Sequence, residues 1–241
     1  MDYFEHYKRV NDLSERGRRS HWRPYDKTIG QFLPAAPDAV IVDVGCGAGI
    51  LLEWLQARGY THALGIDIDA GQIAFCSRLG VHAEQAADTA KWLADQRAKI
   101  DFLIIKDVLE HISIDQVRAI LSAAKTALKP DGKLYIAVPN AASSFASRWR
   151  YIDITHMRSY SDVVLRMEVE QAGFTVTMER DDDTWVIGSL AGALRLVIRT
   201  VFRLIRRLEA LGEFGVDGWR IPLGLNLVMV AKPADDETTG R

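Results

Sequence analysis

Cysteine is scarce in this sequence, and its scarcity narrows the chemistry available to the protein. The 241 residues contain only two cysteines. Cys46 lies in a glycine-rich loop, and Cys76 lies in a segment with the pattern of a helix. Neither their number nor their spacing matches a disulfide framework or a zinc site. We therefore expect no stabilising disulfides and no structural zinc, and a reducing compartment fits this composition.

Long apolar runs and a large excess of one charge are also lacking. No run of 18 uncharged residues occurs, and residues 1–9 are too charged to contain the apolar core of a secretory signal. We therefore expect a cytoplasmic protein. The net charge of -2 gives no general attraction to phosphate backbones, so nucleic acid is not an expected partner.

Short β-branched runs alternate with helical stretches after residue 37, a pattern typical of an α/β fold with a mostly parallel sheet and helices on both faces. The segments 1–37 and 233–241 are interpreted as an N-terminal helical cap or lid and a disordered tail. One domain is expected over 38–232, with 181–224 as a helical insertion before the last strand. The predicted strands are 39–44, 62–67, 81–85, 101–107, 133–138, 174–179 and 225–231.

A glycine-rich loop follows the first predicted strand. Gly45, Gly47 and Gly49 come directly after the apolar run that ends at Val44, and an apolar helix begins near Ile50. Because glycine has no Cβ, this spacing allows a sharp turn and a close approach of a ligand to the main chain. The loop therefore predicts a ligand site between a strand and a helix.

Two carboxylates narrow the class of ligand. Asp67 ends the next predicted strand, about twenty residues after the loop, where a carboxylate binds a ribose diol. Asp43 precedes the first glycine, where its charge repels a pyrophosphate and attracts a sulfonium or ammonium. The glycine spacing also differs from the G-x-G-x-x-G pattern of dinucleotide sites. A cationic nucleoside cofactor is therefore expected.

Three segments occur in an order and spacing that resemble the class I S-adenosylmethionine-dependent methyltransferases: 42–49 (VDVGCGAG), 65–68 (GIDI) and 106–111 (KDVLEH). The resemblance covers roughly 38–180, with 225–232 closing the sheet. It implies a Rossmann-like sheet of seven strands, of which the last is antiparallel. It also implies that S-adenosylmethionine is the cofactor.

The same resemblance implies the cofactor contacts. Asp67 binds the ribose hydroxyls, Ile68 packs on adenine, and Asp107 lies beside the methionine portion. Asp88, next to Thr89, corresponds to the acidic partner of the adenine amino group, although a solvated loop carboxylate is the alternative. The expected cofactor-binding residues are Asp43, Gly45, Gly47, Gly49, Asp67, Ile68, Asp88, Thr89 and Asp107.

The segment 139–160, which follows the fifth predicted strand, is expected to face the methyl acceptor, because ligands of open parallel sheets lie beyond the carboxyl ends of the strands. Transfer to a hydroxyl needs alignment and one base. His156 is the candidate base, with Asp153 orienting its ring, and His111 is the alternative. Alternatively, His156 forms a hydrogen bond that tethers the loop and takes no part in catalysis. Glu110 and His111 could likewise serve only to cap the following helix.

A second resemblance concerns the acceptor. The segments 138–140, 150–156, 160–161 and 172–174 are similar to methyltransferases of bacterial O-antigen and cell-surface polysaccharide pathways. This implies O-methylation of a sugar in a lipid-linked or nucleotide-linked glycan. The alternatives are a small-molecule methyltransferase of the quinone type and a non-catalytic, methyltransferase-like binding subunit. No metal is expected, and the aspartates at 181–183 are interpreted as a solvated turn.

A basic, amphipathic helix is predicted over 190–208, and its arginines share one side, opposite the apolar residues. So many cations make spanning a bilayer improbable, whereas peripheral contact with the inner membrane surface is reasonable. The alternative is that the apolar side packs on the sheet or a partner subunit while the arginines face solvent. The sequence does not indicate an oligomeric state. The arginines are Arg195, Arg199, Arg203, Arg206 and Arg207.

Overall fold

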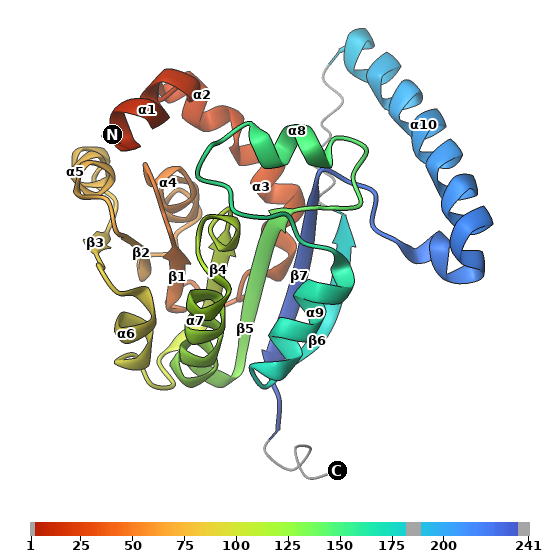
Figure 1. Cartoon of the computed structure of the whole chain (residues 1–241). Helices are drawn as coiled ribbons and strands as arrows, with labels where there is room; N and C mark the ends of the chain where they lie inside the picture. The colour runs from red at the N-terminus through yellow and green to blue at the C-terminus, as the bar shows by residue number, and fades with distance from the viewer. Residues whose placement is uncertain (1–2, 182–188, 236–241) are drawn as a thin grey trace.

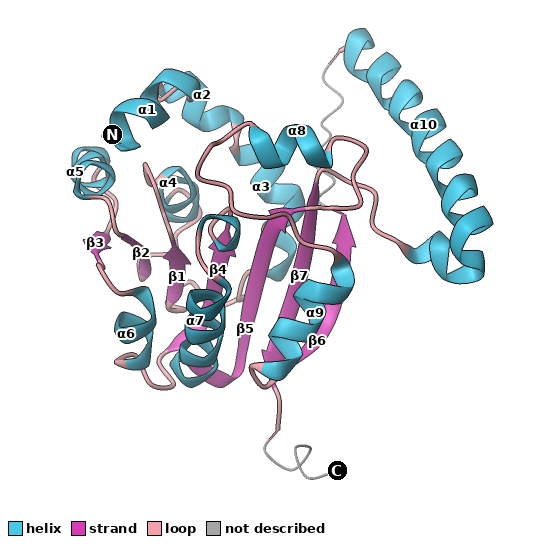
Figure 2. Ribbon diagram, viewed as in Figure 1, coloured by secondary structure: helices cyan, strands magenta, loops and turns pink. Residues whose placement is uncertain are grey.

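A seven-stranded sheet forms the centre of the protein, whose computed structural model describes residues 3–181 and 189–235 (Figures 1 and 2). Every predicted strand overlaps an observed one, so the expected α/β fold is confirmed. The strands lie in the order β3-β2-β1-β4-β5-β7-β6. Their bounds are β1 Ile41–Val44, β2 Ala63–Asp67, β3 Ala83–Gln85, β4 Ile100–Lys106, β5 Leu128–Pro139, β6 Phe174–Asp181 and β7 Asn226–Pro233.

Strands β1 to β5 are parallel, and β7 lies antiparallel between β5 and β6. The expected antiparallel last strand is therefore confirmed. Val44, at the end of β1, pairs with Ile66 of β2 and with Ile105 of β4. The carboxyl ends of three neighbouring strands thus meet at one edge of the sheet, where ligands of such folds bind.

Helices cover both faces of the sheet (Figure 1). On one face, Leu93, Val117 and Leu165 join one buried apolar cluster. On the other face, Ile29 and Trp54 belong to a second. The helices of the first face are α6 Thr89–Ala94, α7 Ile114–Ala127 and α9 Asp162–Gln171, and those of the second are α3 Trp22–Thr28, α4 Ile50–Gln56 and α5 Ala70–Leu79.

Local sequence explains where the long helices begin and end. Helix α7 begins with a capping box in which Ser113 and Gln116 satisfy each other's main-chain N–H groups. After α9, Gly173 adopts a left-handed φ of 85°, a conformation that favours glycine and ends the helix. Strand β5 begins earlier than predicted, because Leu128 pairs with Ile100 across a shift in register.

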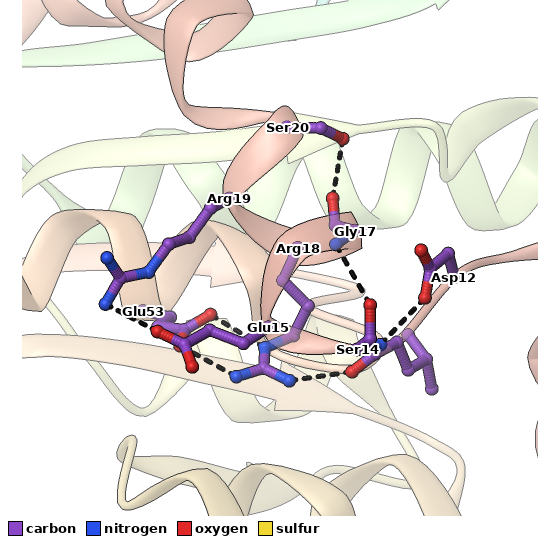
Figure 3. Close-up of polar contacts among 9 residues, drawn as sticks. Asp12, Ser14, Glu15, Gly17, Arg18, Arg19, Ser20 and Glu53 are labelled. Carbon is purple, nitrogen blue, oxygen red and sulfur yellow. Dashed lines mark hydrogen bonds and ion pairs between the residues drawn. The ribbon is translucent and has the colours of Figure 1, made fainter.

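The N-terminal segment forms short helices that dock on the core through Arg18 (Figure 3). Its Nε and Nη2 donate to the two oxygens of Glu53 on α4 at 2.9 and 3.0 Å, and its Nη1 donates to the Leu13 carbonyl. Arg19 instead pairs with Glu15 on an exposed side. The docked helices are α1 Tyr3–Val10 and α2 Glu15–Ser20, followed by α3 and the 3-10 turn η1 Gly30–Phe32.

Helix α10, Leu190–Phe214, stands beside the sheet without covering it (Figure 1). Its apolar side is exposed: Leu190 is 91% and Leu194 is 61% accessible. The interpretation that this side packs on the sheet is therefore wrong. No helix within the described ranges is long and apolar enough to cross a membrane. The 3-10 turn η3, Gly215–Arg220, follows α10, while the predicted tail beyond 235 and the aspartates at 182 and 183 lie outside the described residues.

Candidate functional site

The glycine loop lies at the carboxyl end of β1. Gly45, Gly47 and Gly49 all have positive φ values, of 69°, 53° and 73°. A Cβ on Gly45 would lie 2.4 Å from a methyl group of Val108, whereas the nearest described atom to a Cβ on Gly47 is the Gln72 side-chain nitrogen, at 4.0 Å. Gly45 is thus required by packing. Gly47 leaves open space above the main chain, where a ligand can approach.

Asp67, at the end of β2, holds the loop in place. Its Oδ2 accepts a hydrogen bond from the Gly47 N–H at 2.9 Å, and its Oδ1 accepts one from the Asp69 N–H at 2.9 Å. Burial raises the pKa of Asp67, and these main-chain hydrogen bonds oppose the rise. Each oxygen retains a lone pair for another donor. Asp67 can therefore bind a diol while it fixes the loop.

Asp43 is buried in β1, with 4% of its surface exposed. Burial raises its pKa to about 8; Lys106 opposes the rise, and the neighbouring Asp67 and Asp107 add to it. Burial thus favours the neutral form of this carboxyl, and a positive charge placed beside it favours the ionised form. The sequence did not reveal how deeply this side chain is buried, and therefore did not predict its raised pKa.

A cavity of about 750 Å³ opens above the loop and the ends of β1, β2 and β4. Gly49 is not among its described lining residues, because it begins α4, where a Cβ would lie 2.8 Å from the Cys76 sulfur. The other residues predicted for the cofactor gather there, with the exception of Asp88. The cavity is lined by Asp43, Gly45, Gly47, Asp67, Ile68, Thr89 and Asp107 from that set.

Asp88 caps a helix. Its side chain accepts a hydrogen bond of 2.9 Å from the Lys91 N–H at the start of α6, and it is exposed. Only the neighbouring Thr89 belongs to the described lining of the cavity. The assignment of Asp88 to the adenine amino group is therefore not supported. The reason is local, since an aspartate before a helix satisfies a main-chain N–H.

Asp107 lies directly after β4 in a left-handed conformation, with a φ of 55°. Such a conformation is uncommon outside glycine and costs about 1–3 kcal/mol, and it is frequent at functional sites. The carboxylate forms an ion pair with Lys106, and its main-chain N–H donates to the Ala137 carbonyl at 2.9 Å. Asp107 thus projects from the sheet edge between two cavities.

Several cavity residues were not predicted from the sequence. Tyr7, Asn11, His21 and Tyr25 come from the N-terminal helices. Burial raises the pKa of Tyr25 and, together with Lys106, lowers the pKa of His21. The only feature of the sequence that could have pointed to these cavity residues was the aromatic content of residues 1–37. These side chains place part of the N-terminal segment in the wall of the cavity.

Gln72 of α5 is a further residue that the sequence did not reveal. It is 1% exposed and lines the cavity above the glycine loop. Its Oε1 is buried and has no hydrogen-bond partner among the described residues. An unsatisfied buried acceptor is costly. It therefore indicates that a donor group belongs in this cavity.

A second cavity, of about 970 Å³, adjoins the first. The two share five lining residues from the N-terminal helices and the end of β4. Its other lining residues include aromatic and aliphatic side chains, arginines of α10 and a few uncharged polar groups, so it is largely apolar with a cationic side. They include Phe145 and Trp149 near helix α8 (Ala146–Tyr151), and Arg199, Phe202, Arg203 and Arg206 of α10. The shared residues are Asn11, His21, Tyr25, Lys106 and Asp107.

His111 and Asp153 are linked through Thr155. The Thr155 hydroxyl donates to Asp153 Oδ1 at 2.7 Å, and His111 Nδ1 lies 2.7 Å from the same hydroxyl. Burial acts to raise the pKa of Asp153, but the Thr155 hydrogen bonds and the nearby histidines hold it below its ordinary value. Burial, with His156, lowers the pKa of His111. Asp153 is therefore linked to the His111 ring through Thr155, whereas Nδ1 of the His156 ring lies beside the Trp149 carbonyl.

His156 tethers the segment 139–160, which is predicted to face the methyl acceptor. Its Nδ1 lies 2.9 Å from the Trp149 carbonyl, and its ring meets that of His111 edge to face at 4.6 Å. Of the two histidines, only His111 belongs to the described lining of the cofactor cavity, and neither lines the second. Beside them lies the buried Glu110, whose pKa is raised to about 8 by burial and by Asp107. The geometry favours the tether over the base for His156.

The chain is similar to known methyltransferases in both sequence and fold. Residues 15–179 match the family model described as a methyltransferase domain. The ubiquinone biosynthesis O-methyltransferases of Bartonella bacilliformis and Brucella ovis are 33% identical over 104 residues and 34% identical over 106. These alignments cover 42% and 41% of this chain. They cover 41% and 40% of the relatives, so less than half of each relative is matched.

Two solved structures show the fold over nearly the whole chain. A SAM-dependent methyltransferase from Archaeoglobus fulgidus has a TM-score of 0.64 at 22% identity, covering 90% of this chain and 95% of its own. The methyltransferase in the complex with the Haloferax volcanii Trm112 activator has a TM-score of 0.68 at 18% identity, covering 98% and 99%. At these identities the likeness concerns the fold alone.

Proposed function

The chain belongs to the methyltransferase domain family and is an S-adenosylmethionine-dependent methyltransferase; from this premise we propose that it methylates a hydroxyl group of an anionic, largely apolar acceptor. The observation that carries this proposal is the pair of adjoining cavities, which share Lys106 and Asp107 at the end of β4. One cavity suits a nucleoside cofactor. The other is lined by aromatic side chains and arginines.

The residues of the first cavity fit the cofactor. Asp67 offers lone pairs to the ribose hydroxyls, and the unsatisfied Gln72 Oε1 offers an acceptor to an ammonium group. Asp43 and Asp107 supply carboxyl groups that favour a positive charge. S-adenosylmethionine supplies a methyl group that its positive sulfonium activates for transfer. These contacts remain our proposal for how the chain holds it.

The second cavity supports an acceptor of the quinone type. Phe145, Trp149 and Phe202 suit an aromatic or isoprenoid body, and Arg199 and Arg206 suit a carboxylate or phosphate. The ubiquinone biosynthesis O-methyltransferases among the relatives agree with this class. A glycan on a lipid phosphate is the second candidate. It is favoured by the polar Ser143, Ser144 and Asn226, which lie in the same cavity as Trp149.

The chain's own contribution to the reaction is to align the hydroxyl and to assist the loss of its proton. We assign this assistance to His111. It reaches the cofactor cavity, and Thr155 and Asp153 fix its ring from behind. His156, the base first considered from the sequence, remains a supporting residue in this proposal because its ring is tied to the segment 139–160.

Helix α10 supports contact with an anionic membrane surface. Arg199, Arg203 and Arg206 line the acceptor cavity, whereas Leu194 and Val201 on the opposite side of the helix are exposed. The apolar side can therefore lie in the interface while the arginines meet headgroups or an anionic acceptor. Flotation with vesicles containing anionic lipid tests this: binding that weakens when the three arginines become glutamine supports it, and no binding by either protein contradicts it.

Transfer of labelled methyl groups from S-adenosylmethionine tests the proposed acceptor. The panel contains hydroxylated aromatic acids with and without an isoprenoid chain, lipid-linked sugars and nucleotide sugars. Label in the anionic aromatic acids supports the quinone type, and label in lipid-linked sugars supports the second candidate. Label only in nucleotide sugars contradicts the proposed acceptor. Cofactor binding without transfer to any member favours the non-catalytic binding subunit instead.

A further inference from the structure

We propose that Glu110, His111 and His156 bind a divalent transition-metal ion at the edge of the cofactor cavity. One ligand atom from each residue lies within 4.8 Å of the others. The inference rests on the proposed function and deepens it, because it assigns a means by which His111 assists the loss of the hydroxyl proton. From the sequence we expected no metal, and we interpreted the aspartates at 181–183 as a solvated turn.

Two distant segments create this cluster. Glu110 and His111 belong to the 3-10 turn η2, Leu109–His111, and His156 lies in the loop after α8. The segments are joined by a 2.7 Å hydrogen bond from the Met157 N–H to the Glu110 carbonyl. Metal ligands at about 2.1 Å from an ion lie about 3.5 Å from one another. Small rotations of the three side chains are therefore enough to close the site.

The hydrogen bonds of the two imidazoles fix the nitrogen that remains available. A carbonyl only accepts, so His156 Nδ1 carries the proton that it donates to Trp149. The Thr155 hydroxyl uses its proton on Asp153, so His111 Nδ1 must also be a donor. In both rings Nε2 is left with its lone pair. Metal-binding histidines have this arrangement, with the second nitrogen tied to a carbonyl or a carboxylate system.

Glu110 provides an independent indication of a ligand. The residue is 1% exposed, and its Oε2 is buried without a hydrogen-bond partner among the residues that the structure describes. A buried carboxyl oxygen without a partner is costly. A cation between this oxygen and two imidazoles would offset that cost.

The ligand set points to the class of ion. Two imidazoles and one carboxylate suit zinc, iron, manganese or cobalt, whereas magnesium prefers oxygen ligands. Three protein ligands also leave coordination positions open. Because His111 lines the cofactor cavity, an open position there is placed to bind the acceptor hydroxyl and lower its pKa. In this arrangement His111 acts as a ligand, and the proton of the hydroxyl passes to solvent water as the oxygen attacks the methyl group.

Titration with Co²⁺ tests the site directly, since protein-bound Co²⁺ absorbs visible light whereas Zn²⁺, with its filled d shell, does not. The full-length protein, treated with chelator and then freed of it, is titrated with Co²⁺ and then with Zn²⁺. We expect one Co²⁺ per chain, displaced by Zn²⁺ and not by equimolar Mg²⁺. Glu110→Gln and His156→Gln should each weaken binding by more than the about 10- to 100-fold that loss of an outer hydrogen bond costs.

The matched control is His62→Gln, which changes an exposed histidine at the opposite edge of the sheet. It should bind Co²⁺ as the unchanged protein does. Added Co²⁺ should raise the melting temperature of the unchanged protein and of His62→Gln, and should not raise that of the two ligand variants. The melting temperature without Co²⁺ shows separately whether a variant has a folding defect. Absence of Co²⁺ absorption, or equal affinity in all proteins, overturns the proposal.

Calorimetry with S-adenosylmethionine on the same chelator-treated samples separates the two proposals. Cofactor binding without any Co²⁺ site overturns the metal site and leaves the proposed function standing. Absence of cofactor binding, with or without Co²⁺, overturns the proposed function itself.

Discussion

The main-chain N–H of Gly47 donates a hydrogen bond of 2.9 Å to the carboxylate of Asp67, which lies 20 residues further along the chain. This bond joins the glycine loop after β1 to the end of β2. A single carboxylate thus sets the shape of the loop and presents its remaining lone pairs to the cavity. The relationship explains why these two sequence features occur together.

Replacing Asp67 by alanine should weaken S-adenosylmethionine binding by about 10- to 100-fold, the cost of losing hydrogen bonds to a charged group. The loop would lose its anchor, and the ribose would lose its acceptor. Calorimetry measures the effect. The matched control is Asp88→Ala, which removes the cap of α6 outside the cavity. It should lower stability by about 1 kcal/mol and leave the affinity unchanged; an equal loss in both variants contradicts the assignment.

Binding of the cofactor should depend on pH through Asp43. Burial raises its pKa to about 8, and a sulfonium or ammonium nearby favours the ionised form, so binding should release protons. Affinity should therefore rise as the pH increases toward 8, by up to about tenfold per unit below that value. Calorimetry in buffers of different ionisation enthalpy measures the release. Asp43→Asn should remove it, and an unchanged pH profile in this variant contradicts the prediction.

Arg18→Ala should lower the free energy of unfolding by about 1–2 kcal/mol, because Arg18 and Glu53 form a half-buried pair with two hydrogen bonds. Cofactor affinity should fall as well, since the N-terminal helices line the cavity. Arg19→Ala is the control, because its pair with Glu15 is exposed and contributes less than about 1 kcal/mol. Denaturant unfolding compares the two. Similar losses would show that Arg18 does not anchor the segment.

Arg206→Gln should raise the KM for an anionic acceptor by about tenfold, the value of one charge-assisted hydrogen bond, with little change in kcat. Arg206 lines the acceptor cavity, and its buried Nε has no partner among the described residues. Arg195, on the same helix, is exposed and absent from the cavity lining described above. Arg195→Gln should therefore leave the KM unchanged. An effect of equal size in both variants would point to the charge of the helix as a whole.

The cofactor loop and the sheet were predictable because both depend on local sequence. The tight turn after β1 needs residues at positive φ, and glycines mark it in the sequence. Alternating strands and helices are compatible with only a few sheet topologies. The sequence could not separate two roles for Asp88, because a helix cap and an adenine contact place the same residue type before a helix. The raised pKa of Asp43 escaped prediction because it depends on burial in the complete fold.

The remaining features depend on contacts between distant segments. The roles of Thr155 and Trp149 in holding His111 and His156 appear only once the loop folds onto η2. Likewise, the amphipathic pattern of α10 shows an apolar side and a basic side, but it does not show which of the two faces the rest of the protein. The structure places Arg199 toward the acceptor cavity and leaves Leu194 exposed, an orientation that amphipathicity alone does not predict.

The most direct test of the central claim is transfer of a labelled methyl group from S-adenosylmethionine to hydroxylated aromatic acids, measured for the unchanged protein and for Asp67→Ala. We predict label on a hydroxyl oxygen of an anionic aromatic acceptor, with transfer reduced in the variant at limiting cofactor and restored toward the unchanged rate at saturating cofactor. Absence of label in every such acceptor, or transfer by the variant equal to that of the unchanged protein at limiting cofactor, would contradict the account.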